Sequence, residues 1–343
     1  MMESLGLYLS EKGWIPDASI RKGIRRLCRE RQSQGPATEE LQGWIDQHID
    51  TMNSSPIAIL QDAANTQHYE VPAEFFHHCL GPRLKYSSCL WEPGDTLADA
   101  EIRALQATTE HADLHDGQEI LELGCGWGSL TLWMAEQFPN ARITGVSNSH
   151  GQRESIEHKC RERGLQNVQI ITADVNQFQS EQKHDRVVSI EMFEHMRNWR
   201  ALLQRIRGWV HDDGRLMIHV FCHRHTPYFF EDRGSGDWMA RHFFSGGLMP
   251  SLDLPQHFTA DFEVEQSWEW DGTNYERTAN AWLECLDENR QAAMACLKSS
   301  ESGVKASVAL QRWRMFFMAC AELFGLDEGQ SWLVGHYRLA PAS

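Results

Sequence analysis

The sequence predicts an α/β fold in which a seven-stranded mixed sheet is covered by helices, with a helical cap at the N-terminus and a late lid insertion. From Gln118 onward, short apolar runs alternate with amphipathic segments, the pattern of strands buried between helices in a largely parallel sheet. A chain of 343 residues can also bury one large α/β core together with an accessory helical layer.

The N-terminal segment reads as two amphipathic helices. Over Ile20–Glu30, apolar residues recur at helical spacing opposite a basic face. Thr38–Met52 repeats this pattern with leucine and isoleucine. We expect both helices to belong to a cap formed by residues 1–66.

Seven apolar segments further along the chain read as strands. In chain order they are Glu119–Leu123, Arg142–Val146, Val168–Thr172, Arg186–Ile190, Arg215–Phe221, Phe262–Trp270 and Ser331–Leu339. Helical patterns separate the first five strands, near residues 127–138, 150–163 and 198–211.

The expected division of the chain follows from these elements. Residues 67–221 form the core, residues 222–261 an inserted lid, and residues 262–343 the C-terminal part of the core with a helical insertion. A long insertion after a late strand is typical of a segment that covers a substrate.

The segment between Phe221 and Trp282 is dense in aromatic residues. Such side chains suit a pocket for a flat or cationic substrate, although each one is as readily explained by packing within the insertion. His223 and His225 flank a single residue, but no carboxylate or second cysteine lies at matching spacing, so we predict no metal site.

Composition narrows the choice of partners. The formal charge is -16, from 48 acidic and 32 basic residues, and such a chain repels nucleic acid and anionic lipid surfaces. Neither a signal peptide nor a membrane-spanning run is apparent. The nine cysteines form no C-x-x-C pair, so they predict neither a zinc ribbon nor a disulfide scaffold. We expect a cytoplasmic protein, with a homodimer left open.

The sharpest local feature is Glu122-Leu123-Gly124-Cys125-Gly126-Trp127-Gly128, which follows a predicted strand and opens a helix. Its glycines permit a tight turn and a close approach of the backbone to a ligand. The spacing is G-x-G-x-G rather than the dinucleotide-binding G-x-G-x-x-G, and Glu122 before it suits an ammonium group better than a pyrophosphate. These features predict a site for a nucleoside that carries an amino acid.

A second cluster follows the fourth strand, where Glu191, Glu194 and His195 lie within five residues. Spacings of three and four place them on one side of a turn, at the sheet edge where open α/β sheets bind ligands. The alternative is a structural turn, in which Glu191 caps a helix and the other two form a solvated pair.

At this point the chain resembles the cyclopropane fatty acid synthase superfamily of methyltransferases and, within it, the coclaurine N-methyltransferase branch. The resemblance rests on the two clusters above and on five further stretches: Gly13-Trp14-Ile15-Pro16-Asp17, His68-Tyr69-Glu70-Val71-Pro72, Leu84-Lys85-Tyr86-Ser87-Ser88-Cys89, Ser147-Asn148-Ser149 and Phe243-Phe244-Ser245-Gly246-Gly247. It implies a Rossmann-like class I methyltransferase whose cofactor is S-adenosyl-L-methionine.

The resemblance also implies where the cofactor lies. Tyr86 and Ser87 contact its methionine end, above Gly124 and beside Gly126. The remaining contacts are implied near the ribose and methionyl groups for Ser147, Asn148 and Gln152, and at the adenine for Asp174 and Val175. The usual ribose-binding acid is absent after the second strand, as it is throughout the superfamily, and an aspartate in the position of Asp174 is also an ordinary helix cap.

The chemistry of an amine explains the acidic cluster. An alkylamine is mostly protonated at neutral pH, and an ammonium ion has no lone pair with which to attack a methyl group. Carboxylates attract the cation, and His195 titrates near neutral pH and suits the role of base. The family's Glu-His pair matches Glu194 and His195, with Glu191 as a supporting carboxylate. Substrate contacts are assigned to Tyr69, His219, Phe244 and Tyr275.

The predicted function is therefore methylation of the nitrogen of a small amine. One alternative is a lipid-modifying C-methyltransferase or cyclopropane synthase, which uses a bicarbonate held partly by a cysteine. This chain has Ser88 there, although Glu194, His219 and Tyr275 match the other bicarbonate-holding positions. Another alternative is a protein that binds the cofactor without catalysis.

Overall fold

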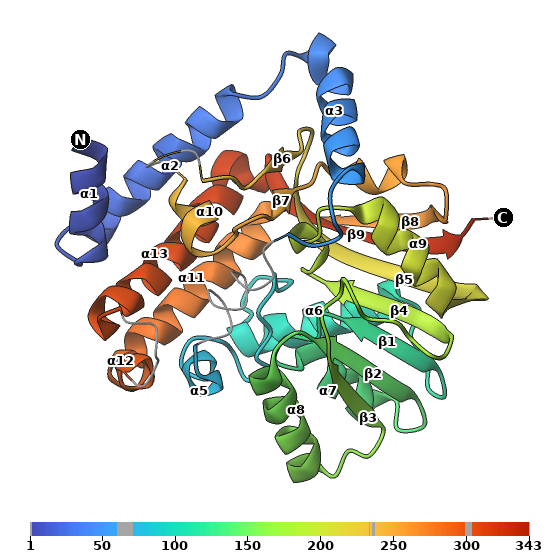
Figure 1. The fold of residues 1–343 in the computed structure, drawn as a ribbon. Helices are drawn as coiled ribbons and strands as arrows, with labels where there is room; N and C mark the ends of the chain where they lie inside the picture. Colours follow the sequence, from blue (N-terminus) through green and yellow to red (C-terminus); the bar gives the residue numbers. More distant parts are fainter. Residues whose placement is uncertain (1, 60–70, 233, 235–236, 299–303, 343) are drawn as a thin grey trace.

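The structure is a computed structural model that describes residues 2–59, 71–232, 234, 237–298 and 304–342. Seven strands form its central sheet: β1 (Glu119–Leu123), β2 (Arg142–Ser147), β3 (Val168–Thr172), β4 (His184–Ile190), β5 (Val210–His223), β8 (Phe262–Trp270) and β9 (Trp332–Pro341). Their order is β3-β2-β1-β4-β5-β9-β8 (Figure 1).

The first five strands are parallel, while β9 pairs antiparallel with both β5 and β8. The predicted seven-stranded mixed sheet is therefore confirmed. β5 is longer than predicted because it begins at Val210 and continues to His223. The first half of the strand contains the polar residues His211, Asp212 and Asp213, which explains why the apolar run alone marked only the second half.

Helices surround the sheet at its ends and faces. They are α1 (Met2–Glu11), α2 (Asp17–Ser33), α3 (Leu41–Asn53), α5 (Ala73–Phe76), α6 (Leu97–His111), α7 (Ser129–Gln137), α8 (His150–Arg163), α9 (Trp199–Trp209), α10 (Trp238–His242), α11 (Gly272–Glu288), α12 (Arg290–Lys298) and α13 (Ala306–Phe324). Short 3-10 turns are η1 (Thr38–Glu40), η2 (Phe193–His195), η3 (Leu254–His257) and η4 (Leu326–Gly329). In the part of the chain that is described, none of the helices combines the length and apolar character needed to cross a lipid bilayer.

Alternating strand residues supply the two faces of the core. Ile120 and Val188 point to the side covered by α6 and α7, whereas their neighbours Leu121 and Val187 pack with the tryptophan-rich face of α9. This period of two is what a strand buried on both faces requires.

The N-terminal helices pack against the late helices of the chain. α2 contributes Ile20 and Cys28 to the same apolar cluster as α11 and α13. Arg21 and Arg25 of α2 both pair with Glu322 of α13, each at 2.9 Å. Figure 1 shows α2, α11 and α13 side by side, next to the sheet. α2 and the late helices thus form one helical layer, whereas α3 of the predicted cap contributes Met52 to the apolar cluster that contains α9.

The strand order places a crevice at the middle of the sheet. From β1 the chain moves outward through β2 to β3, and it then returns to β4 on the other side of β1. The connections at the carboxyl ends of β1 and β4 therefore diverge, and ligands of open α/β sheets bind at such a point. The glycine turn follows β1, and η2 with the acidic cluster follows β4.

Candidate active site

A cavity of about 200 Å³ opens at this divergence. Its walls come from the segment before α6, the ends of β1, β2 and β4, and the predicted lid. Both predicted clusters reach it: Glu122, Gly124 and Gly126 on one side, and Glu191, Glu194 and His195 on the other. Tyr86, Ser87, Ser147, Asn148, Gln152, Val175, Phe244 and Tyr275 line it as well.

The glycine turn has the geometry that its sequence predicted. Gly124, Gly126 and Gly128 all have positive φ angles, of 80°, 51° and 83°, which L-residues adopt only with strain. A Cβ on Gly124 would lie 2.9 Å from the Cβ of Met192, whereas one on Gly126 would meet nothing within 4 Å. The backbone at Gly126 is thus open toward the cavity, as a site for a closely approaching ligand requires.

We expect Gly124→Asp to abolish binding of S-adenosylhomocysteine, the demethylated form of the proposed cofactor. The side chain is strained by the left-handed backbone and collides with Met192, so the turn must shift away from its present path. Calorimetry measures the affinity. Gly117→Asp is the matched control, because its φ is 87° and a Cβ there meets nothing within 4 Å. Unchanged affinity in a folded Gly124→Asp variant would contradict this cofactor site.

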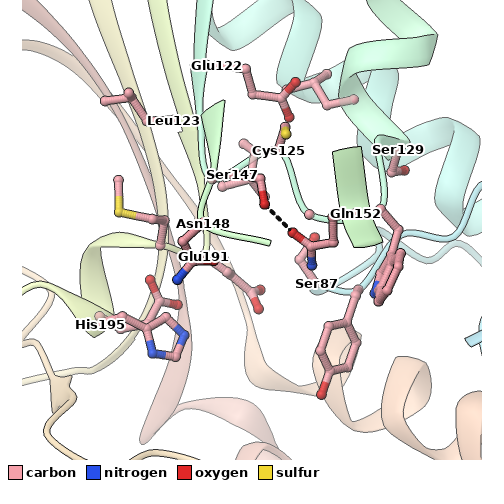
Figure 2. Close-up of a pocket in the computed structure, with 18 of the residues that line it drawn as sticks. Ser87, Glu122, Leu123, Cys125, Ser129, Ser147, Asn148, Gln152, Glu191 and His195 are labelled. Carbon is pink, nitrogen blue, oxygen red and sulfur yellow. Dashed lines mark hydrogen bonds between the residues drawn. The ribbon is translucent and has the colours of Figure 1, made fainter. Parts of the chain in front are cut away.

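Polar groups at the end of β2 are oriented by one another. Ser147 Oγ donates to Gln152 Oε1 at 2.7 Å (Figure 2). Ser149 Oγ accepts from the Gln152 backbone N–H at 3.3 Å and caps α8. This bonding holds the hydroxyl and amide at the cavity wall. Together with the open glycine turn, they fit the sugar and amino-acid groups of S-adenosylmethionine.

Glu122 supplies a buried carboxyl group beneath the glycine turn. Its side chain is 2% exposed, and burial raises the pKa of this carboxyl to about 8 although Thr131 Oγ1 donates to it at 2.5 Å. A ligand ammonium group nearby would favour the ionised form. The position therefore fits the amino group of the cofactor.

The segment before α6 is held from within by two charged residues that the sequence analysis missed. Lys85 is 3% exposed, and its Nζ donates to Ser87 Oγ and to the Ser88 carbonyl, both at 2.6 Å. The buried Glu101 carboxylate accepts from the backbone N–H groups of Arg83 and Lys85, at 2.8 and 3.1 Å. Lys85 lies inside the Leu84–Cys89 stretch that carried the family resemblance, and that stretch was the signal that could have identified it.

Glu191 is the most tightly held member of the acidic cluster. Its Oε1 accepts from the Ser88 backbone N–H at 2.9 Å and lies 3.1 Å from His219 Nε2, while Tyr275 donates to Oε2 at 2.6 Å. Its φ is 46°, a left-handed value that is rare and unfavourable outside glycine. Such strain persists only where surrounding contacts impose it. The alternative in which Glu191 caps a helix does not describe it, because its carboxylate faces the cavity among these donors.

Glu194 and His195 occupy η2 in different surroundings. Glu194 is fully buried, and neither carboxylate oxygen has a well-formed hydrogen bond within the described residues. Burial, followed by the charge of Glu191, raises its pKa well above the usual range. The His195 ring is only partly buried and stacks on Phe244, with centroids 5.3 Å apart and planes at 3°. The alternative of a solvated Glu-His pair therefore does not describe Glu194 and His195.

Two assigned residues do not line the cavity. The Asp174 Oδ1 accepts from the Asn176 backbone N–H at 2.6 Å within a turn after β3, and no helix begins there, so neither the adenine contact nor the helix cap is seen for it. His219 is fully buried behind Glu191, so a direct substrate contact by His219 stays a prediction. Tyr69 falls outside the described residues.

The bicarbonate-holding positions can now be compared with the geometry. His219 and Tyr275 both contact the Glu191 carboxylate, as does the backbone of Ser88. Glu194 stands apart from this group of hydrogen bonds. The Glu191 carboxylate thus lies between Ser88, His219 and Tyr275, at the positions that would hold bicarbonate.

Comparison with known proteins supplies the family. Residues 59–332 match the family described as mycolic acid cyclopropane synthetase. The chain belongs to this family. It is 35% identical over 335 residues to (S)-coclaurine N-methyltransferase of Thalictrum flavum subsp. glaucum, covering 95% of this chain and 92% of the relative. The corresponding enzyme of Papaver somniferum is 34% identical over 333 residues, covering 95% of each.

A solved structure agrees over nearly the whole fold. Coclaurine N-methyltransferase bound to N-methylheliamine and S-adenosylhomocysteine superposes with a TM-score of 0.94 at 33% identity, covering 99% of this chain and 100% of that one. The family is therefore the predicted one, and the protein is an S-adenosylmethionine-dependent methyltransferase. Within the described residues, no group of three or more His, Cys, Asp or Glu is arranged to hold a metal ion.

Proposed function

We propose that this enzyme methylates the nitrogen of a small, basic alkaloid-type amine built on an aromatic ring system. Coclaurine and its relatives are the model for this substrate class. The observation that carries the proposal is the pairing of two buried carboxyl groups, Glu191 and Glu194, in a cavity walled by Phe221, Phe244 and Phe316. Carboxylates and aromatic faces both attract an organic cation.

When bound, S-adenosylmethionine supplies a methyl group on a positively charged sulfur, which leaves without acid assistance. The residues of the chain bind and align the amine and control its proton. Glu194 and Glu191 attract the ammonium form. His195, held by stacking on Phe244, takes a proton from the nitrogen and exposes its lone pair. The aromatic wall excludes water and orients the ring system.

Amine methylation is favoured over the lipid alternative by the Glu191 carboxylate. It is bonded to Ser88, His219 and Tyr275, so the enzyme carries its own anion at the place where a cyclopropane synthase holds bicarbonate. An amine needs no base after methyl transfer to quench a carbocation. We therefore expect turnover that does not depend on added bicarbonate.

The proposal is tested with methyl-labelled cofactor and a panel of tetrahydroisoquinoline and phenolic amines, with products identified by mass spectrometry. Vesicles of unsaturated phospholipid form the competing arm, and each arm is run with and without bicarbonate. We expect label on amines, at equal rates in both buffers. Label in lipid, or strong dependence on bicarbonate, would replace the proposal with the lipid alternative. Binding without label in either arm would leave only a cofactor-binding protein.

Two further predictions accompany this proposal. The first is a cytoplasmic location, because all nine cysteines are free thiols and free thiols suit a reducing compartment. The homodimer stays a prediction, and the exposed Leu5, Tyr8 and Trp14 are the apolar side chains that a second copy would cover. Light scattering in dilute solution distinguishes dimer from monomer.

A further inference from the structure

Three histidines extend from the Glu191 carboxylate to the surface of the protein. His219 of β5, His336 of β9 and Trp268 of β8 are direct cross-strand neighbours, so they form a row over three adjacent strands. His111, the last residue of α6, stacks on Trp268 with centroids 3.9 Å apart and planes at 8°. It is only partly buried, whereas His219 and His336 are fully buried.

Two of the three steps along the row are within hydrogen-bond distance. His219 Nε2 lies 3.1 Å from Glu191 Oε1, and His336 Nδ1 lies 2.9 Å from His111 Nδ1. Between these two links, the rings of His219 and His336 have centroids 4.4 Å apart. His219 Nδ1 and His336 Nε2 are buried with no hydrogen-bond partner in the described part of the chain. No hydrogen bond joins the two rings here, so a proton passes between them only when one ring rotates to bring His219 Nδ1 and His336 Nε2 within hydrogen-bond distance.

Packing alone does not explain this row. A buried imidazole nitrogen without a partner destabilises the fold, and apolar side chains would fill the same space without that penalty. The charged groups facing the rings are Lys85, Glu191 and Arg338, and burial together with the cations keeps all three imidazoles neutral by lowering their pKa values. A neutral imidazole accepts a proton at one nitrogen and donates one from the other.

We propose that His219, His336 and His111 form a proton path by which the Glu191–Glu194 pair loses its proton to solvent when a protonated amine binds. Two neighbouring buried carboxyl groups do not both ionise readily, so the pair holds a proton until a cation arrives. The arriving amine fills the cavity, so the proton needs a route other than the cavity mouth. This path rests on the proposed function in that the substrate must be cationic.

The proton balance is simple. When the proton shared by the two carboxyl groups is on Glu191, it moves to His219 Nε2, while His219 Nδ1 gives its own proton to His336 Nε2. His336 Nδ1 then gives a proton to His111 Nδ1, and His111 Nε2 releases one to water. One proton enters the row and one leaves it, no other bond changes, and the carboxylate left behind pairs with the ammonium ion. His195 still takes the later proton from the substrate nitrogen.

The geometry of Glu191 supports its place at the start of the path. A carboxylate offers about four acceptor positions, and the contacts to Ser88, His219 and Tyr275 use three. The remaining position is available to a cation in the cavity that Glu191 lines. The same carboxylate thus faces the substrate on one side and the histidine row on the other.

The test separates proton release from methyl transfer. Protein saturated with S-adenosylhomocysteine, which carries no methyl group to transfer, is mixed in weak buffer with a protonated tetrahydroisoquinoline. Tryptophan fluorescence follows binding, and a pH indicator follows release of the proton. We expect both signals to rise together in the wild type. In His336→Gln, amine affinity should be retained and the proton should appear at least tenfold later than the binding signal.

His184→Gln is the matched control, because His184 is also buried, lies on β4 and is bonded to Ser180 outside the row. Should His336→Gln fail to fold, His111→Ala tests the partly buried end of the path. Its delayed proton release should be restored by imidazole added to the buffer. A merely structural histidine would show no such rescue.

A second readout uses a fluorinated analogue of the same amine that is already neutral at pH 7. Its methylation requires no ionised pair, so the path variants should slow the basic amine and spare the analogue. Equal slowing of both amines, or prompt proton release in the folded His336→Gln and His111→Ala variants, would overturn the path alone. Failure of wild-type protein to methylate any amine would overturn the proposed function instead.

Discussion

Replacing His195 with alanine is expected to lower turnover of a basic amine roughly 10²–10⁴-fold, the usual scale for a lost general base. Affinity for S-adenosylhomocysteine should hardly change, since His195 is not among the residues predicted to contact the cofactor. Single-turnover rates and calorimetry measure the two quantities. A loss of turnover at constant cofactor affinity identifies a group that acts on the substrate proton.

The pH dependence gives an independent reading of the same variant. Above the pKa of the free amine, solution supplies neutral amine, so the variant should recover part of its activity as the pH rises. His48→Ala is the control, because the His48 ring also packs on a phenylalanine, Phe229, with centroids 5.0 Å apart and planes at 33°, yet lies outside the cavity lining. Near wild-type rates for His195→Ala at every pH would leave η2 as a structural turn.

The sheet was predictable because its strands are buried on both faces. The strand Glu119–Leu123 is apolar at Ile120, Leu121 and Leu123, and turn residues mark where it ends. α6 was not predicted, although its start carries a capping box in which Thr96 and Asp99 are bonded reciprocally.

The sequence predicted which acidic and histidine side chains line the site, but not which hydrogen bonds they make. Local spacing placed Glu191, Glu194 and His195 at one sheet edge, and all three do line one cavity. The same spacing carried no information on partners distant in the chain, such as His219 for Glu191. His111 and His336 are 225 positions apart, and only the pairing of β5, β9 and β8 brings them together.

Replacing Glu194 with glutamine is expected to weaken binding of a protonated amine roughly 10- to 100-fold, the range set by about 1.5–3 kcal/mol for a hydrogen bond to a charged group. Turnover should fall as well, because the carboxylate holds the cation before and during methyl transfer. The two effects are separated by calorimetry of the S-adenosylhomocysteine complex and by single-turnover rates at saturating amine. The neutral fluorinated amine should bind both forms alike.

The same substitution should stabilise the free protein at higher pH. Burial raises the pKa of Glu194 above that of the unfolded chain, so the folded state holds its proton more tightly. This contribution is fully present below the pKa of the unfolded carboxyl and is lost as the pH rises through the folded pKa, because an ionised carboxylate must then be buried. In the window between the unfolded and folded pKa values, stability therefore falls as pH rises.

Glutamine has no proton to lose, so Glu194→Gln removes the part of the pH dependence of stability that comes from Glu194, while the remaining groups titrate as before. Thermal unfolding at pH 5 and pH 8, without cofactor or amine, should show the variant gaining on the wild type as the pH rises. Glu110→Gln is the control, because Glu110 is an exposed carboxylate on α6. A variant that binds the cationic and neutral amines like the wild type, with an unchanged difference in melting temperature between the two pH values, would show that Glu194 neither attracts the substrate nor carries a displaced pKa.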